Sequence, residues 1–276
     1  MDCGAVVLAG GRSARMGTSK AALEWHGSTL LYRTAAIVAR AAGGPVVVVR
    51  ARGQELPALP AAVTVVDDPR EGKGPVQGIA AGLAALAGRA EAAFVTSTDL
   101  PLLHPAFVAR VLRELENGPD VALPVARGYQ QPLAAAYRTA LAGLAGRLVA
   151  GERLKPAFLF RECAVTRLDD ATLLADPVLA WLDPGLDSVL NVNTPADYQA
   201  ARRRPAPEVT VQSPGAPGRR VRAATAAAAA QAAGLSFADL VAAVNGTRPT
   251  RDGRAPLATG DTVSFRPWRP RGGCRG

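Results

Sequence analysis

The sequence predicts an α/β fold: a doubly wound, mostly parallel sheet followed by a small α+β domain. Strand-like and helix-like segments alternate through residue 200, as in a chain of βαβ units. A stretch rich in Pro and Arg interrupts this pattern at 202–207. With 276 residues, the chain is long enough for one large and one small domain. We therefore expect a first domain at 1–201, a linker at 202–207 and a second domain at 208–276.

Short apolar runs rich in β-branched residues predict the strands of the first domain. These runs are 5–8, 46–49, 63–66, 92–96, 121–124 and 133–137. Helices are expected at 30–42, 76–86 and 105–117, with glycines at the ends of the first and the third. In such sheets ligands bind beyond the carboxyl ends of the strands, so the loops there are the candidate site.

The loop after the first strand carries the strongest functional signal. It contains Leu8-Ala9-Gly10-Gly11, then Arg15-Met16-Gly17, then Lys20. Glycines let the main chain approach a ligand closely, and its N–H groups, with Arg15 and Lys20, suit a polyphosphate. The spacing fits neither the Walker loop nor the dinucleotide-binding fingerprint. The pattern favours another kind of nucleotide loop, with a plain glycine-rich turn as the alternative.

Aspartates follow two other predicted strands. Asp99 stands just after the strand 92–96, and Asp67 and Asp68 end the strand 63–66. Mg²⁺ prefers one or two carboxylates together with phosphate oxygens and water. We predict that Asp99 binds the cation; the alternatives are that Asp99 caps the next turn and that one of the other two is a turn residue before Pro69. These residues suit nucleotidyl transfer, in which the protein positions a triphosphate and neutralises its charge.

Charge and cysteine content limit the partners. The net charge of +9 comes from 202–276, which hold 13 Arg and 4 acidic residues, whereas 1–201 are balanced. This excess lacks interleaved aromatics or a nucleic-acid motif, so no nucleic-acid partner is expected. No apolar run is long enough for a membrane span and no leader is evident. Cys3, Cys163 and Cys274 are far apart and suit a reducing compartment, so we expect a cytoplasmic protein that does not bind membranes.

Six segments then occur in a fixed order: 8–20, 74–79, 99–101, 131–137, 151–153 and 191–195. Together they resemble the molybdenum cofactor guanylyltransferase family, over about residues 4–200. The resemblance implies an enzyme that transfers GMP from Mg-GTP to the terminal phosphate of the molybdopterin cofactor and releases pyrophosphate. Its cofactor would be Mg²⁺, and its substrates GTP and molybdopterin. A cytidylyltransferase for the same cofactor, or another cofactor nucleotidyltransferase, is the alternative.

The resemblance also implies roles for particular residues. Catalysis would depend on Arg15, Lys20 and Asp99, with Asp99 as the metal ligand. The nucleotide would contact Leu8, Ala9, Gly10, Gly11, Lys20, Arg50, Asp68 and Asp99. The pterin side would comprise Gly74, Gly78, Arg153, Lys155, Asn191 and Asn193. From the residues alone, the two asparagines could instead cap the helix after Pro195, and Arg153 and Lys155 could be solvated.

The chain departs from the family pattern at two positions. Ser19 stands where the family commonly has Asp before the lysine, and Arg50 stands where it has a nucleotide-contacting Asn. A guanidinium cannot accept a hydrogen bond, so contacts to the base or the ribose must differ at Arg50. The choice between guanine and cytosine therefore stays open.

The second domain has the predicted order β-β-α-β-β, with strands at 209–211, 220–223, 241–244 and 262–265 and a helix at 225–233. With Asn245-Gly246 and Gly272-Gly273, it resembles the ubiquitin-like β-grasp sulfur carriers of molybdopterin and thiamine synthesis. The resemblance implies a sulfur-carrying terminus at Gly272-Gly273, although Cys274-Arg275-Gly276 follow. A trimmed carrier, an untrimmed module that docks other molybdenum cofactor or molybdoenzyme proteins, and a domain kept for stability are all compatible with this. A non-enzymatic scaffold that delivers the cofactor or sulfur is the alternative to an enzyme.

Overall fold

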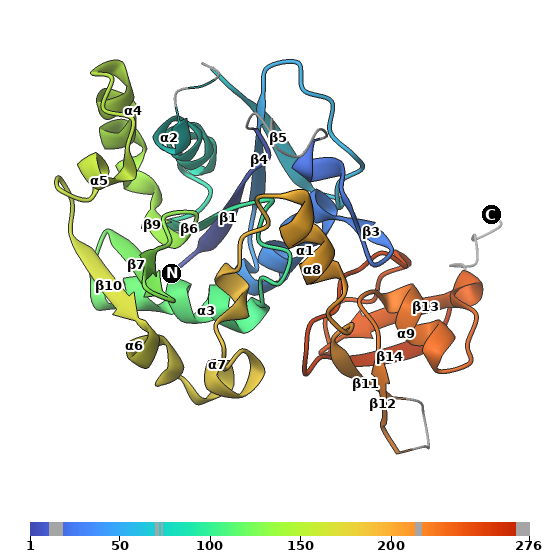
Figure 1. Ribbon diagram of the computed structural model, residues 1–276. Coiled ribbons are helices and arrows are strands. Elements are labelled where there is room, and N and C mark those ends of the chain that lie inside the picture. The colour runs from blue at the N-terminus through green and yellow to red at the C-terminus, as the bar shows by residue number, and fades with distance from the viewer. Residues whose placement is uncertain (11–18, 70–71, 73, 213–216, 269–276) are drawn as a thin grey trace, which may run out of the picture. The chain divides into compact units, whose positions relative to one another are not determined.

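The computed structural model describes residues 1–10, 19–69, 72, 74–212 and 217–268. The chain divides into two compact units. One comprises Met1–Trp25 and Thr29–Ala201, and the other His26–Ser28 and Arg202–Gly276. Figure 1 shows the helices and strands of each unit.

The large sheet of the first unit has eight strands in the described part of the chain, in the order β10-β7-β9-β6-β1-β4-β5, with β8 paired to β7. The bounds are β1 Cys3–Leu8, β4 Val46–Ala51, β5 Val63–Asp68, β6 Ala92–Ser97, β7 Val121–Ala126, β8 Tyr129–Gln130, β9 Ala134–Arg138 and β10 Val165–Asp169. Neighbours among β6, β1, β4 and β5 are parallel, as are β7 and β10. β9 runs antiparallel to β6 and β7. The predicted mostly parallel sheet is confirmed.

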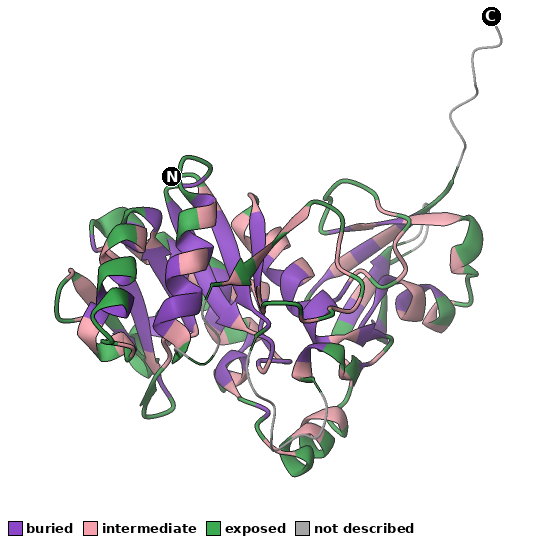
Figure 2. Cartoon of the chain, turned by 90° about the horizontal axis from the view of Figure 1, so that it is seen from above, coloured by how far each residue is buried: buried purple, intermediate pink, exposed green. Residues whose placement is uncertain are grey.

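Helices cover both faces of this sheet (Figure 1). α1 (Leu30–Ala42) and α3 (Pro105–Glu114) share one core with Ala5 and Val7 of β1. α2 (Gly74–Leu86) and α4 (Ala142–Ala150) share the other core with Val6 and Leu8. Successive strand residues point to opposite faces, so an apolar run such as that of β1 feeds both cores. Figure 2 shows the strands largely in purple, the colour of buried residues.

The remaining shorter elements up to residue 202 belong to the first unit, except that Ser28 of β3 and Arg202 of α8 fall in the second. They are β2 Glu24–Trp25, β3 Ser28–Thr29, α5 Pro156–Leu159, α6 Asp170–Leu174, α7 Pro177–Leu182, α8 Pro195–Arg202 and 3-10 turns at Lys20–Ala22, Leu115–Asn117, Thr139–Leu141 and Asp187–Val189.

Local signals explain where the predicted helices begin and end. The hydroxyl of Thr29 accepts a hydrogen bond from Tyr32 N, and Gly43 ends α1 with a φ of 72°. α1 therefore has the predicted bounds. α3 ends at Glu114, short of the prediction, and a 3-10 turn continues to Asn117 before Gly118. α2 begins two residues earlier than predicted, at Gly74.

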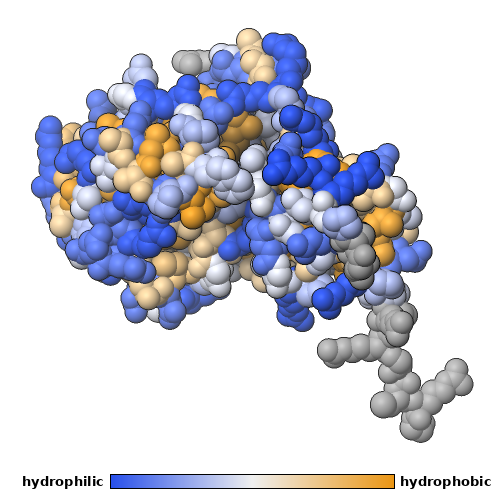
Figure 3. Space-filling view, turned by 90° about the horizontal axis from the view of Figure 1, so that it is seen from below, coloured by the Kyte–Doolittle hydropathy of each residue, from blue (hydrophilic) through white to orange (hydrophobic). Residues whose placement is uncertain are grey.

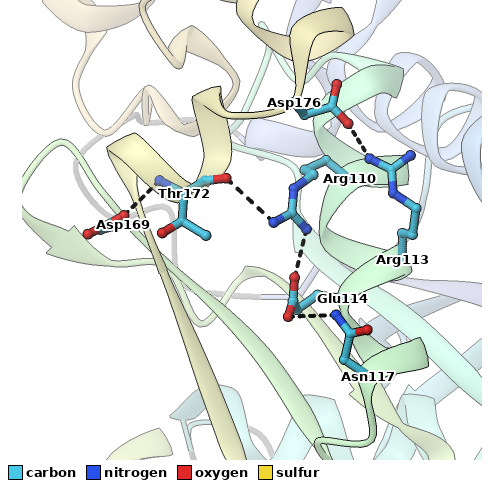
Figure 4. Close-up of polar contacts among 7 residues, drawn as sticks. All are labelled: Arg110, Arg113, Glu114, Asn117, Asp169, Thr172 and Asp176. Carbon is cyan, nitrogen blue, oxygen red and sulfur yellow. Dashed lines mark hydrogen bonds and ion pairs between the residues drawn. The ribbon is translucent and has the colours of Figure 1, made fainter.

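An ionic network joins α3 to α6 and α7 (Figure 4). Arg110 pairs with Glu114 at 2.9 Å and donates to the main-chain oxygen of Thr172. Arg113 pairs with Asp176, whose carboxylate also accepts from two N–H groups at the start of α7. Burial opposes ionisation of Asp176, but these hydrogen bonds and the Arg113 charge outweigh it, so the pKa of Asp176 is lowered. The network fastens the short helices against the sheet.

The second unit contains a sheet with the order β12-β11-β14-β13. β11 (Glu208–Gln212) and β14 (Thr262–Pro267) are parallel, while β12 (Arg219–Arg222) and β13 (Leu240–Val244) pair antiparallel with them. α9 (Ala226–Ala232), which Thr225 caps, shares a separate core with the sheet, and a 3-10 turn lies at Phe237–Asp239. These strands and this helix occur where the sequence predicts them.

None of the helices in the described residues is both long enough and apolar enough to span a membrane. Figure 3 shows one face of the molecule, on which hydrophilic residues predominate and apolar residues form separate patches.

Two helical glycines should respond in opposite ways to substitution by alanine, because only one of them packs closely against a neighbouring strand. A Cβ at Gly82 would stand 2.3 Å from Val6 Cγ1, whereas one at Gly146, an exposed position of α4, would meet nothing within 4 Å. We expect Gly82→Ala to lower the free energy of unfolding by about 1–3 kcal/mol through overpacking. Gly146→Ala should raise it by about 0.5–1 kcal/mol, because alanine favours a helix over glycine. Urea denaturation of both variants measures this, and equal stability of Gly82→Ala and the parent would contradict it.

Candidate active site

A pocket of about 490 Å³ lies where the chain leaves the carboxyl ends of the parallel strands. From β1 the chain passes to β4 on one side, and it later returns to β6 on the other, so β1 and β6 flank a topological switch point. The pocket is lined by Leu8, Ala9, Gly10, Lys20, Val49, Arg50, Ala51, Asp68, Gly72, Gly74, Pro75, Gly78, Ser97, Thr98, Asp99 and Leu133. Leu133 joins them because β9 is antiparallel and starts at the same edge.

Main chain forms the wall of the pocket between β1 and β4. Ala9 N donates to Val49 O at 2.8 Å, and a Cβ at Gly10 would stand 3.0 Å from Ala51 N. This distance is shorter than ordinary Cβ contacts, so a residue with a side chain would require a small shift of the main chain. The carbonyl oxygen of Ala9 is also engaged, because it accepts from the Gln54 amide at 3.0 Å.

A second close approach brings the start of α2 onto β1. A Cβ at Gly78 would stand 3.0 Å from Leu8 Cδ2. Gly74 has a φ of +70°, which favours glycine, and its own Cβ would lie 3.4 Å from Leu154 O. The N-terminus of α2 therefore lines the pocket, and the loop at Leu154 lies beside it.

Lys20, Asp99 and Asn193 form the polar centre of the site. Lys20 Nζ donates to Asn193 Oδ1 at 2.9 Å and lies 3.5 Å from Asp99 Oδ2. The hydroxyl of Ser97 donates to Asp99 Oδ1. The side chains of Lys20 and Asp99 are 18% and 22% exposed, so a ligand can reach both. The ammonium can bind phosphate oxygens, and the carboxylate has the chemistry of a cation ligand.

A buried network holds the segment that supplies Asn193. Val192 N donates to Asp99 O at 2.9 Å, which ties this segment to the loop after β6. Ser188 Oγ accepts from His104 N at 3.0 Å, and the Asp183 carboxylate accepts from Ser188 N at 3.0 Å. Burial raises the pKa of Asp183, although these hydrogen bonds oppose the rise. The segment before α8 is thus anchored to the loop that carries Asp99.

The start of α8 is capped by Thr194, not by the asparagine side chains, which were the alternative candidates for this role. Thr194 Oγ1 accepts from Asp197 N, and the Asp197 carboxylate accepts from the N–H groups of Asn193 and Thr194. The pKa of Asp197 is lowered by the hydrogen bond with the Thr194 side chain, by those two N–H groups and by the charge of Lys20. The side chain of Asn193 is therefore available to hold Lys20.

Arg50 lines the pocket from the end of β4. Its Nε donates to Asp67 Oδ1 at 2.8 Å, and a terminal nitrogen donates to Gln54 O at 3.0 Å. Asp67 is thus the ion-pair partner of Arg50, whereas Asp68 is the aspartate of β5 that lines the pocket.

The donor set fits a divalent cation bound together with a substrate. Within the described residues, no group of three or more His, Cys, Asp or Glu side chains could hold a metal. Asp68 and Asp99 supply carboxylates to the same pocket. A cation there would need oxygen ligands from phosphate and water, which is the preference of Mg²⁺.

The structure brings most of the predicted site residues together, but not all. Asn191, Asn193, Arg153 and Lys155 are exposed and do not line the pocket, although Asn193 contacts Lys20, which does. Arg153 instead pairs with Glu162 and lies 5.0 Å from the centre of the Phe158 ring. Gly11 and Arg15 lie outside the described residues.

Known proteins resemble this chain in the part that forms the pocket. The model of the MobA-like NTP transferase domain matches residues 5–165. The chain belongs to the MobA-like NTP transferase family. It is therefore a nucleotidyltransferase by family.

Related proteins are similar over most of their own length. A probable molybdenum cofactor guanylyltransferase of Methanosarcina acetivorans is 33% identical over 71% of this chain and 88% of the relative. One of Opitutus terrae is 36% identical over 72% and 95%. The crystal structure of molybdopterin-guanine dinucleotide biosynthesis protein A from Archaeoglobus fulgidus gives a TM-score of 0.56 at 22% identity, over 72% and 96%. These alignments leave more than a quarter of this chain unmatched.

The contact between Lys20 and Asn193 predicts a difference between two asparagines. We expect Asn193→Ala to raise the Kd for a nucleoside triphosphate about 2- to 10-fold, because Lys20 loses the acceptor that positions it. Asn191→Ala is the matched control, since both asparagines are exposed and neither lines the pocket, but Asn193 accepts the hydrogen bond from Lys20. Titration of both variants with Mg-GTP measures this. Equal effects of the two substitutions would show that Asn193 does not position Lys20.

Proposed function

We propose that this chain is a molybdenum cofactor guanylyltransferase. It would transfer GMP from Mg-GTP to the terminal phosphate of the molybdopterin cofactor and release pyrophosphate. The observation that carries the proposal is a glycine-walled pocket of a MobA-like fold that Lys20 and Asp99 line, with Lys20 held by Asn193. The names of the relatives support the choice of acceptor.

In this proposal the side chains of the pocket position the triphosphate and balance its charge. Lys20 binds phosphate oxygens and stays oriented through Asn193. Asp99, oriented by Ser97, and Asp68 would hold the cation. The cation, when bound, neutralises phosphate charge and polarises phosphoryl oxygens. An oxygen of the acceptor phosphate attacks the α-phosphorus, the bond from that phosphorus to the bridging oxygen breaks, and pyrophosphate leaves.

The acceptor is proposed to approach from the side of α2. Gly74 and Gly78 lie at the start of that helix, and Leu154 stands beside Gly74. The flanking cations Arg153 and Lys155 are exposed and suit an anionic pterin phosphate. Asn191 is assigned to the same side by resemblance, and Arg15 and Gly11 to the nucleotide loop.

Release of pyrophosphate with Mg²⁺ and molybdopterin tests this function. We expect turnover with GTP and little with CTP. Lys20→Ala and Asp99→Ala should each lower turnover about 100-fold or more, because each removes a group that neutralises or positions the triphosphate. Turnover with CTP alone would assign the chain to the cytidylyl branch. Full activity of both variants would overturn the site.

For the second unit we propose a β-grasp module related to sulfur carriers, which docks partner proteins of the same pathway. The parallel central pair β11 and β14, with α9 between the two hairpins in sequence, supports this fold. Gly272 and Gly273 lie outside the described residues, so the proposal rests on topology and sequence.

Truncation after Arg204 separates the two proposals. We expect the truncated chain to keep its GTP turnover with free molybdopterin, because the first unit has its own two cores and the pocket residues. Loss of turnover in a folded truncated chain would show that the second unit is needed for transfer.

The intact mass of the full chain would show whether the last three residues are trimmed, as a carrier requires.

A further inference from the structure

Gln54 is a polar side chain beside the pocket wall that the proposed reaction does not use. It follows β4 in a tight turn, in which Gln54 N donates to Ala51 O at 3.0 Å and Gly53 has a φ of +73°. The turn folds the side chain back toward the strand ends. There its amide nitrogen donates to Ala9 O and its amide oxygen accepts from Ala51 N, each at 3.0 Å.

These two bonds determine the orientation of the amide. Ala9 O can only accept and Ala51 N can only donate, so one orientation alone satisfies both. The bonds join the loop after β1 to the end of β4, the two stretches of main chain that line the pocket. They do so at the point where Gly10 lets these stretches approach closely.

The same turn also holds Arg50. The main-chain oxygen of Gln54 accepts from the Arg50 guanidinium, whose Nε pairs with Asp67 on β5. One residue therefore connects the ends of β1 and β4 through its side chain, and reaches β5 through Arg50. The two amide bonds of Gln54 and its main-chain contact with Arg50 are all made within the chain itself.

We propose that Gln54 is a positioning residue for the nucleotide subsite. It sets the spacing between Ala9 and Ala51 and thereby the shape of the wall that the nucleotide meets. This inference rests on the proposed function in one respect, namely that a nucleotide occupies this pocket. Gln54 does not line the pocket itself, so it acts through the main chain and not by contact with the ligand.

The substitution Gln54→Glu tests the donor bond to Ala9. An ionised carboxylate still accepts from Ala51 N but cannot donate to Ala9 O, so the Kd for Mg-GTP should rise about tenfold. A protonated carboxyl group regains a donor and mimics the amide. The ratio of the Kd of Gln54→Glu to that of the parent should therefore fall toward one as the pH is lowered from about 8 to about 4, the range in which an ordinary glutamate side chain takes up its proton.

The parent and the two Gln54 variants share all other charged groups near this site. They are the Arg50–Asp67 pair, Arg52 and Glu55 of the same loop, and Lys20, Asp68 and Asp99 of the pocket. Because these groups and GTP are common to the parent and both variants, each result is expressed as the ratio of the variant's Kd to the parent's Kd at the same pH. Gln54→Ala is the matched control, because it loses both bonds and has no group to protonate; its ratio should stay high at every pH.

Kinetics give a second measurement. We expect Gln54→Glu and Gln54→Ala to raise KM for GTP about tenfold with kcat changed less than about threefold, since the reacting groups are untouched. Equal binding by all three chains, or the same pH response in both variants, would overturn the inference. If Gln54→Glu does not fold, Gln54→Ala alone provides the test. A loss of kcat without a change of KM in Gln54→Ala would then overturn the inference. A parent chain that binds no GTP would instead overturn the proposed function.

Discussion

The pocket depends on the close approach of two stretches of main chain, the loop after β1 and the end of β4. At Gly10 a Cβ would stand 3.0 Å from Ala51 N, closer than ordinary contacts, and Ala9 N adds a hydrogen bond to Val49 O. Because the carboxyl ends of parallel strands meet at one edge, Ala9 and Gly10 line the same pocket as Asp68 and Asp99. A Cβ at position 10 would require the main chain of this wall to shift slightly.

The polar centre is built from parts of the chain that are distant in sequence. Lys20 comes from the start of the first unit, Asp99 from the end of β6, and Asn193 from the segment before α8. Two main-chain donors join the last two parts: Val192 N to Asp99 O, and His104 N to the buried Ser188. The geometry at Lys20 is thus set by packing across the unit, because its two partners come from distant segments that are bonded to each other.

Local sequence patterns predicted the elements of the fold well. The β-branched run at 46–49 became a buried strand next to the edge strand β5, and α1 has the predicted ends because Thr29 and Gly43 cap it. The antiparallel direction of β9 was not predictable, because direction depends on the path of the chain and not on the composition of the strand. In the site, spacing grouped Asn191 with Asn193, yet only Asn193 meets Lys20, since no regular strand holds the segment. Gln54 was missed for a related reason: a side-chain bond to distant main chain leaves no periodic signal.

The late position of Asn193 has a consequence for the order of events during synthesis. A growing chain emerges from its N-terminus, and domains generally fold as units. The glycine loop and Lys20 emerge first, but the residue that orients the lysine emerges after almost all of the first unit. A partly synthesised chain therefore has a nucleotide loop without its final support. Competence to bind a triphosphate in the working geometry would be acquired late, as the ribosome moves on to the second unit.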